Sequence, residues 1–147
     1  MEKRFEIFTT QIAKINRAIK KIKSEEMKEY NLKTPHVSCL HYLFKQNRPL
    51  TAKELCDACD EDKAAISRTI EFLEKNEYVV CDSNKEKRYK TPISLTEKGK
   101  KIGEVISSKI DYIIGIASTG LTEEDRTVFY KGLMLISSNL QNITSKY

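Results

Sequence analysis

The segment from Leu50 to Gly99 constrains the fold of this chain of 147 residues more than any other part of the sequence. Its pattern predicts two short helices, a charged hairpin and the start of a further helix. A helix-turn-helix followed by such a hairpin, or wing, is an architecture that places one helix in a DNA major groove. We therefore predict a winged helix-turn-helix lobe over residues 34–95.

The two short helices are predicted from their capping chemistry. Thr51 is a good N-cap for the first helix, and Glu54, three residues later, completes a capping box. The chain must turn sharply after this helix, and Asp60 suits a left-handed conformation because its short polar side chain tolerates it. Asp62 then caps a second helix that runs from residue 63 to about residue 76.

The second helix is predicted to face the core with Ile66, Ile70 and Leu73, which recur at spacings of four and three. Small, hydroxyl and basic side chains crowd its first two turns. Small residues let a backbone approach a groove, and Arg binds guanine through two hydrogen bonds. The alternative for this pattern taken alone is an ordinary solvated helix face. The predicted DNA-binding residues of the helix-turn-helix are Thr51, Lys63, Ala64, Ala65, Ser67, Arg68 and Thr69.

The wing is predicted from two short β-prone runs, residues 78–80 and 91–95, and Pro92 favours an edge position for the second run. Four cations and one acid occupy residues 85–90 between them. Cations at a hairpin tip contact phosphates or enter a minor groove, although a solvated tip has the same composition. The predicted DNA-binding residues of the wing are Lys85, Lys87, Arg88 and Lys90.

The sequence ELCDACDEDKAAISRTIEFLEKNEYV, followed by KRYKTPISLTEKGK, resembles the MarR family of winged-helix transcriptional regulators. The flanking helices fit that family too, so the resemblance covers nearly the whole chain. Its most specific piece is the element from Leu95 to Gly99. The resemblance implies a wing-tip role for Arg88 and DNA reading by Ala64, Ala65, Ser67 and Arg68.

Two turns depart from the pattern of that family. The family often has glycine where Asp60 and Glu77 stand. Asn76 is predicted to supply the left-handed residue at the end of the second helix. Ala64 and Ala65 replace hydroxyl residues that are common at the start of that helix, which alters the expected base contacts.

A helix is also predicted to begin at Thr34-Pro35, with Thr34 as its cap and Pro35 at its first helical position. This helix is expected to support the lobe from behind. Its predicted buried residues are Val37, Leu40, Leu43 and Phe44.

Apolar residues near both ends of the chain repeat at heptad spacing, which is typical of helices that pack on other helices. The stripes are Phe5, Phe8, Ile12, Ile15, Ile19 and Ile22 near one end, and Phe129, Leu133, Ile136, Leu140 and Ile143 near the other. A third amphipathic helix is predicted from Thr96 to just before Gly120. One small lobe cannot bury all three helices, so a two-fold homodimer is expected, with an intramolecular bundle as the alternative.

The predicted fold class is therefore mainly α with a small β wing. The chain is expected to be a single MarR-type domain, residues 1–147, in which the lobe is joined to N- and C-terminal dimerisation helices. Those helices are expected within residues 1–33 and 96–147.

The charge of the chain does not by itself indicate nucleic acid. The net charge is +5, yet residues 48–92 hold nine Lys or Arg and ten Asp or Glu, whereas residues 1–35 have a net charge of +4. An acidic lobe favours one alternative, a winged-helix module that binds proteins. Since no apolar run reaches membrane-spanning length and no signal peptide is evident, we expect a cytoplasmic protein without a membrane partner.

Cys56 and Cys59 raise a second alternative, a thiol- or zinc-sensing regulator. A structural zinc site needs four ligands at defined spacing, and the sequence offers one such pair, so packing of small side chains is the preferred interpretation. His36 and His41 are five residues apart, a spacing that a helix does not bring together. Without a phosphate-binding loop or a nucleophile motif, we expect no enzyme and no cofactor or metal.

Together these features predict a sequence-specific transcriptional regulator, most simply a dimeric repressor that binds a palindromic operator in double-stranded DNA. The resemblance further implies release from DNA by a small-molecule effector. The resemblance would place that effector near Ile12, Asn16, His36 and Ile110.

Overall fold

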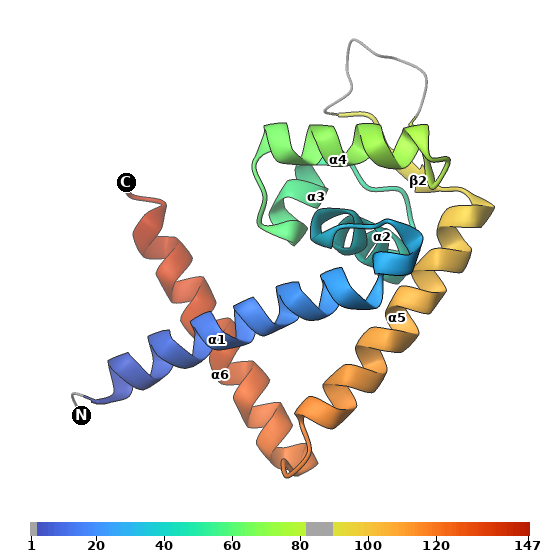
Figure 1. The fold of residues 1–147 in the computed structure, drawn as a ribbon. Coiled ribbons are helices and arrows are strands. Elements are labelled where there is room, and N and C mark those ends of the chain that lie inside the picture. Colours follow the sequence, from blue (N-terminus) through green and yellow to red (C-terminus); the bar gives the residue numbers. More distant parts are fainter. Residues whose placement is uncertain (1–2, 82–89) are drawn as a thin grey trace. The chain divides into compact units, whose positions relative to one another are not determined.

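The computed structural model describes residues 3–81 and 90–147 and shows a mainly helical chain with a small two-stranded sheet (Figure 1). The predicted fold class is thereby confirmed. The chain divides into two compact units, Met1–Lys109 and Ile110–Tyr147. In chain order the elements are α1 (Lys3–Glu26), a short 3-10 helix (Lys28–Tyr30), α2 (Thr34–Gln46), α3 (Ala52–Cys59), α4 (Lys63–Lys75), β1 (Val79–Cys81), β2 (Ile93–Leu95), α5 (Glu97–Ala117) and α6 (Glu123–Thr144).

Helices α2, α3 and α4 lie together and form the core of the first unit (Figure 1). The stripe predicted for α4 is confirmed, since Ile66, Ile70 and Leu73 are each at most 5% exposed. Leu55 of α3 and Leu40 of α2 are fully buried as well. Burial of one such aliphatic side chain contributes roughly 1.5–3 kcal/mol to folding. Burial of these stripes therefore fixes the helix-turn-helix on α2.

The wing sheet is short because its second strand begins late. Strands β1 and β2 are antiparallel, with Cys81 opposite Ile93. The second strand was predicted to begin at residue 91, but it begins two residues later, immediately after Pro92. Because proline has no backbone N–H, its position outside the strand leaves every residue of β2 with a hydrogen-bond donor. Ile93 also pairs with Leu50: the Leu50 N–H donates to the Ile93 carbonyl at 3.1 Å, and the Ile93 N–H donates back at 2.8 Å. The sheet is thereby tied to the connection between α2 and α3.

Helix α2 begins as a helix at Thr34, and the prediction that Thr34 is its cap is wrong. Lys33, with extended backbone, occupies the N-cap position. The Thr34 hydroxyl donates instead to the carbonyl of Lys20 in α1, at 3.2 Å. A tertiary contact with α1 thus takes the hydroxyl that the cap would have used. Of the side chains predicted to be buried here, three are buried and Phe44 is half-buried: Val37, Leu40 and Leu43 are at most 2% exposed.

The left-handed residue at the end of α4 is Glu77, with φ of 62°, and the prediction of Asn76 is wrong. The Tyr78 N–H donates to the Leu73 carbonyl at 2.9 Å, and the Glu77 N–H donates to the Glu74 carbonyl at 3.0 Å. These two bonds form a Schellman motif, which requires its left-handed residue at the position of Glu77. A glutamate in that conformation is strained by roughly 1 kcal/mol compared with glycine.

The start of α5 is fastened to the end of α4 by the side chains of Thr96 and Lys98. The Thr96 hydroxyl accepts a hydrogen bond from the Gly99 N–H at 3.0 Å and donates to the Glu77 carbonyl at 2.6 Å. The Lys98 ammonium donates to the Asn76 carbonyl at 2.8 Å. The element that carried the family resemblance is therefore a structural junction.

Two glycines of α5 allow a close approach at this junction. A Cβ on Gly99 would lie 2.0 Å from the carbonyl oxygen of Tyr78, and a Cβ on Gly103 would lie 2.8 Å from the Cβ of Phe44. By contrast, a Cβ on Gly115 would meet nothing within 4 Å. The first turns of α5 thus pack at distances that any side chain at residue 99 or 103 would prevent.

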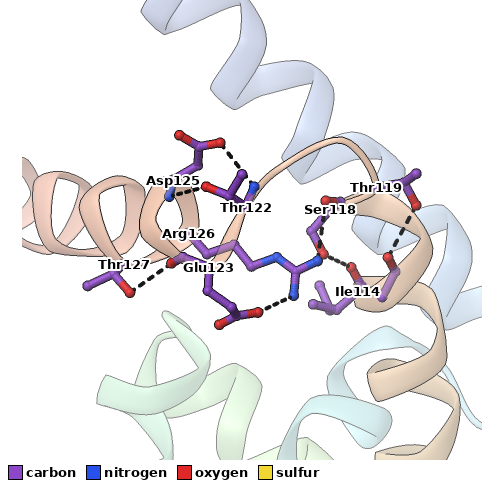
Figure 2. A network of polar contacts seen from close by, with 9 residues as sticks. Ile114, Ser118, Thr119, Thr122, Glu123, Asp125, Arg126 and Thr127 are labelled. Atoms are coloured by element: carbon purple, nitrogen blue, oxygen red, sulfur yellow. Dashed lines mark hydrogen bonds and ion pairs between the residues drawn. The ribbon is translucent and has the colours of Figure 1, made fainter.

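In the second unit, polar side chains hold the turn between α5 and α6 (Figure 2). The Arg126 guanidinium pairs with Glu123 at 2.9 Å and donates to the Ser118 carbonyl at 3.5 Å. Thr122 and Asp125 form a capping box: the Asp125 N–H donates to the Thr122 hydroxyl at 3.1 Å, and the Thr122 N–H donates to the Asp125 carboxylate at 3.0 Å. The hydrogen bond from the Thr122 N–H, followed by that from the Thr122 hydroxyl, lowers the pKa of the Asp125 carboxyl.

The apolar stripes predicted at the two ends of the chain are uncovered in the single chain. No residue of α1 (Lys3–Glu26) or of α6 (Glu123–Thr144) is buried. Ile15 is 48% exposed, Phe129 48% and Leu140 49%. Among the described residues, no helix has the length and apolar character needed to cross a membrane.

Candidate nucleic-acid interface

The N-terminus of α4 is built by the two aspartates that the sequence pointed to. Asp60 has φ of 52°, so the predicted left-handed turn is confirmed. The Asp62 carboxylate accepts a hydrogen bond from the Ala65 N–H at 2.7 Å, which confirms it as the N-cap of α4. The turn and the cap fix the direction in which α4 leaves α3.

The side chains that α4 presents to solvent are small or basic. Ala64, Ser67 and Arg68 are exposed and Ala65 is half-buried, while the opposite side of the helix carries the buried stripe. Lys63, the first residue of the helix, is exposed as well. The structure therefore gathers these five predicted residues on one surface, which we call the α4 surface. A helix with small, hydroxyl and guanidinium groups on one free side has the shape and donors that a major groove accepts.

Thr69 differs from the other residues predicted on α4. It is 5% exposed and belongs to the buried side of the helix. Position 69 is three residues after Ile66, so it falls within the width of an ordinary core-facing stripe. We therefore leave Thr69 out of the α4 surface.

Thr51 is the N-cap of α3. Its hydroxyl accepts a hydrogen bond from the Glu54 N–H at 3.2 Å, and the Glu54 carboxylate accepts one from the Thr51 N–H at 3.2 Å, so the predicted capping box is confirmed. Arg48 contacts the same carboxylate at 2.7 Å. The hydrogen bond from Arg48, followed by that from Thr51, lowers the pKa of Glu54. A DNA contact by Thr51 stays a prediction.

Of the four predicted wing cations, the structure describes only Lys90, at the base of the wing. Lys85, Lys87 and Arg88 lie outside the described residues. Lys90 is exposed and is followed by the buried Thr91. Contact of the four wing cations with DNA therefore stays a prediction.

The sulfur atoms pair differently from the Cys56 and Cys59 pattern in the sequence. The Sγ atom of Cys59 lies 3.9 Å from the Sγ atom of Cys39, which is fully buried in α2. Burial, followed by the charge of Asp57, raises the pKa of the Cys56 thiol. Among residues 3–81 and 90–147, no group of three or more His, Cys, Asp and Glu side chains is arranged to hold a metal ion.

His36 is engaged in packing between α2 and α4. Its ring stacks on Phe72 with a centroid distance of 3.9 Å and an interplanar angle of 5°. Its Nδ1 atom accepts a hydrogen bond from the Lys33 N–H at 3.0 Å. Burial, and then the charge of Lys33, lowers the pKa of His36. His36 is thus part of the helix packing, and its place in an effector site stays a prediction.

Comparison with known proteins identifies the same architecture. A family model described as a winged helix DNA-binding domain matches residues 32–99. No curated protein matches the chain.

Solved structures resemble the chain over almost its whole length. One is a MarR family transcriptional regulator from Listeria monocytogenes complexed with a 26mer DNA: 27% identity, TM-score 0.79, covering 91% of this chain and 89% of that one. A MarR protein from Peptoclostridium difficile has 24% identity and a TM-score of 0.81, covering 92% and 88%. The complex of S. aureus MepR with DNA has 19% identity and a TM-score of 0.77, covering 90% and 96%. The predicted resemblance to the MarR family is confirmed.

Proposed function

Since the chain is a winged-helix protein with the MarR-family fold, we propose that it binds operator DNA as a homodimer and represses transcription until a small-molecule effector releases it. The α4 surface reads bases in the major groove. The wing cations Lys85, Lys87, Arg88 and Lys90 contact the DNA backbone or the minor groove. Two copies related by a two-fold axis then match a palindromic site.

One observation carries this proposal: α4 exposes small side chains and the guanidinium of Arg68 to solvent while its other side is buried. Arg68 and Ser67 are exposed one turn after the capped N-terminus, next to the small residue Ala64. A helix that served only to support the lobe would not need a free side of this composition. Relatives with the same fold have been solved with DNA, which supports the assignment.

The uncovered stripes of α1 and α6 support the homodimer. Large apolar side chains such as Ile15, Phe129 and Leu140 are about half exposed in the single chain. Contiguous exposed apolar surface of this kind marks an interaction surface. A second copy of the chain offers matching stripes, and two-fold dimers are the commonest oligomers.

Replacement of Arg68 by alanine tests the α4 surface. In an unbiased selection of duplexes, the unmodified protein should enrich a palindrome, and Arg68→Ala should bind it about 5- to 150-fold more weakly, equivalent to about 1–3 kcal/mol. Lys14→Ala is the matched control, because it removes one exposed positive charge from α1. An equal loss of affinity for operator and random duplex would contradict base reading by Arg68. Absence of any salt-sensitive binding to duplex DNA would favour the protein-binding module instead.

A groove in the first unit supports the effector part of the proposal, although it is not lined by Ile12, Asn16, His36 or Ile110, near which the family resemblance would place the effector. It has a volume of about 460 Å³ and is lined by apolar residues, including Phe44 and Leu95, and by charged ones, including Arg48, Lys100 and Glu104. Small-molecule sites usually have volumes of about 300–1,000 Å³ and combine apolar walls with a few polar groups. Benzoate, an aromatic anion, is a suitable probe. It should raise the melting temperature of the unmodified protein and release duplex DNA, and Arg48→Ala should abolish both effects.

A further inference from the structure

Two cysteines that are twenty residues apart in the sequence meet in the first unit. The Sγ atoms of Cys39 and Cys59 lie 3.9 Å apart, which is within hydrogen-bonding distance for sulfur, and both thiols are free of a disulfide. Cys39 is fully buried in α2, and Cys59 is the half-buried last residue of α3. A thiol at an accessible edge thus has a second thiol directly behind it.

The two thiols are chemically unequal. Either sulfur can be the donor of the hydrogen bond between them. This hydrogen bond, together with the positive charge of Lys23, lowers the pKa of Cys59 despite its burial and the nearby Glu61. The same hydrogen bond, followed by burial, raises the pKa of Cys39. Lys23 is held in place by a bond from its ammonium to the Ser38 hydroxyl at 2.9 Å. Of the two thiols, Cys59 therefore loses its proton more readily than Cys39.

We propose that Cys59 and Cys39 form a dithiol that reacts with hydroperoxides and closes to a disulfide. The Cys59 thiolate attacks the distal oxygen of the hydroperoxide, the O–O bond breaks, and the leaving oxygen takes a proton to become an alcohol or water. Cys59 is then a sulfenic acid. The Cys39 sulfur attacks the Cys59 sulfur, the S–O bond breaks, and the hydroxide leaves as water with the Cys39 proton. Two thiols are oxidised and one peroxide is reduced.

The bond would act on the N-terminus of α4. To reach bonding distance the two sulfur atoms must approach by roughly 2 Å. We expect Cys59 to move, because it is half-buried at the end of α3 whereas Cys39 is fully buried within α2. The next residue, Asp60, is the left-handed turn residue, and Asp62 is the N-cap of α4. The disulfide therefore displaces the turn that aims α4. Resting on the proposed function, this displacement should lower affinity for operator DNA by about tenfold, a common size for coupling between two sites.

The thiol chemistry is tested on the protein alone. Hydrogen peroxide should consume two of the four thiols and link the tryptic peptides 34–45 and 54–63. Since peptide 54–63 also holds Cys56, the experiment is repeated in a Cys56→Ser background, where the link should persist. Cys59→Ser should abolish the link, and Cys39→Ala should leave a sulfenic acid that dimedone traps. Cys81→Ser is the matched control and should change nothing. Oxidation of Cys56 or Cys81 ahead of Cys59, or thiol loss without the 34–45 to 54–63 link, would overturn the proposal.

The effect on DNA is tested separately. The reduced protein should bind the selected palindrome, peroxide should weaken binding about tenfold, and a thiol reductant should restore it. In Cys59→Ser, binding should be unaffected by peroxide. If the reduced protein does not bind DNA while the disulfide still forms, the proposed function fails and the dithiol stands. If the linked protein binds with unchanged affinity, the coupling of the dithiol to α4 is overturned.

Discussion

Helices α4 and α6 both have apolar residues at helical spacing, and both begin with a side-chain cap, yet they differ completely in burial. Four of the 13 residues of α4 are buried, whereas none of the 22 residues of α6 is. Local sequence is sufficient to form either helix, but burial depends on the surfaces available to it. The core around α4 is complete within one chain. The apolar stripe of α6 can be buried only by a surface that the single chain does not supply.

The largest effect should come from placing a charge on the α6 stripe. Leu140→Glu buries an unpaired carboxylate in the proposed dimer, which costs several kcal/mol for each copy, so the protein should sediment as a monomer at micromolar concentration. Asn139→Glu is the matched control, because it adds the same charge at the neighbouring exposed residue and should leave the dimer intact. A dimer of unchanged mass in Leu140→Glu would remove α6 from the interface.

The next largest effect is expected on the stability of the lobe. Gly99→Ala should lower the free energy of unfolding by about 3 kcal/mol, because its Cβ would lie 2.0 Å from the Tyr78 carbonyl oxygen. Gly115→Ala in the same helix should raise it by about 0.5–1 kcal/mol, since the position is open and alanine favours a helix. Urea denaturation measures both. Equal effects of the two substitutions would contradict the tight junction at the start of α5.

Removing the capping boxes of α3 and α6 allows the stability of the lobe to be compared directly with that of α6. Thr51→Ala and Thr122→Ala each remove one cap, a loss of about 1 kcal/mol of helix stability. In the lobe this loss should lower the midpoint of global unfolding, because α3 is packed in the core. At α6 it should appear as faster amide hydrogen exchange in the first turn, with little change in the global midpoint. A global shift of the same size in both variants would show that α6 unfolds together with the lobe.

The smallest effect concerns Glu77. Glu77→Gly should stabilise the protein by up to about 1 kcal/mol, because glycine adopts the left-handed conformation without strain. Glu77→Ala removes the same carboxylate but keeps a Cβ, so it should not stabilise. Thermal denaturation of the two variants separates conformation from charge, and stabilisation by alanine would favour charge.

Local rules allowed much of the lobe to be predicted. Asp60, Asp62 and the capping box of Thr51 and Glu54 act within four residues of sequence, so the sequence alone determines them. The position of the left-handed residue after α4 was predicted one residue too early. The Schellman pairing of Tyr78 with Leu73, both buried, selects Glu77 over the intrinsically better Asn76.

The site was predicted less completely, for two physical reasons. Thr69 was assigned to the DNA side because its hydroxyl suits DNA, but the buried stripe of α4 is wider than the residues spaced at four and three. The contact between Cys39 and Cys59 depends on how α2 packs on α3, which spacing along the chain does not reveal. The sequence motif directed attention to Cys56 as the partner of Cys59, whereas Cys39 contacts Cys59 in the structure.

Because the apolar stripe of α6 is exposed in the single chain, the stability of the terminal helices should depend on protein concentration. In the proposed dimer, the free energy that holds α1 and α6 comes partly from association, so it follows mass action. Dilution should lower the melting temperature of the terminal helices, while the lobe, with its own core, should melt at a temperature independent of concentration. At low concentration such a dimer would dissociate before its lobes unfolded. The abundance of the protein would then set the fraction that is paired for a two-fold operator, before any effector or oxidant acts.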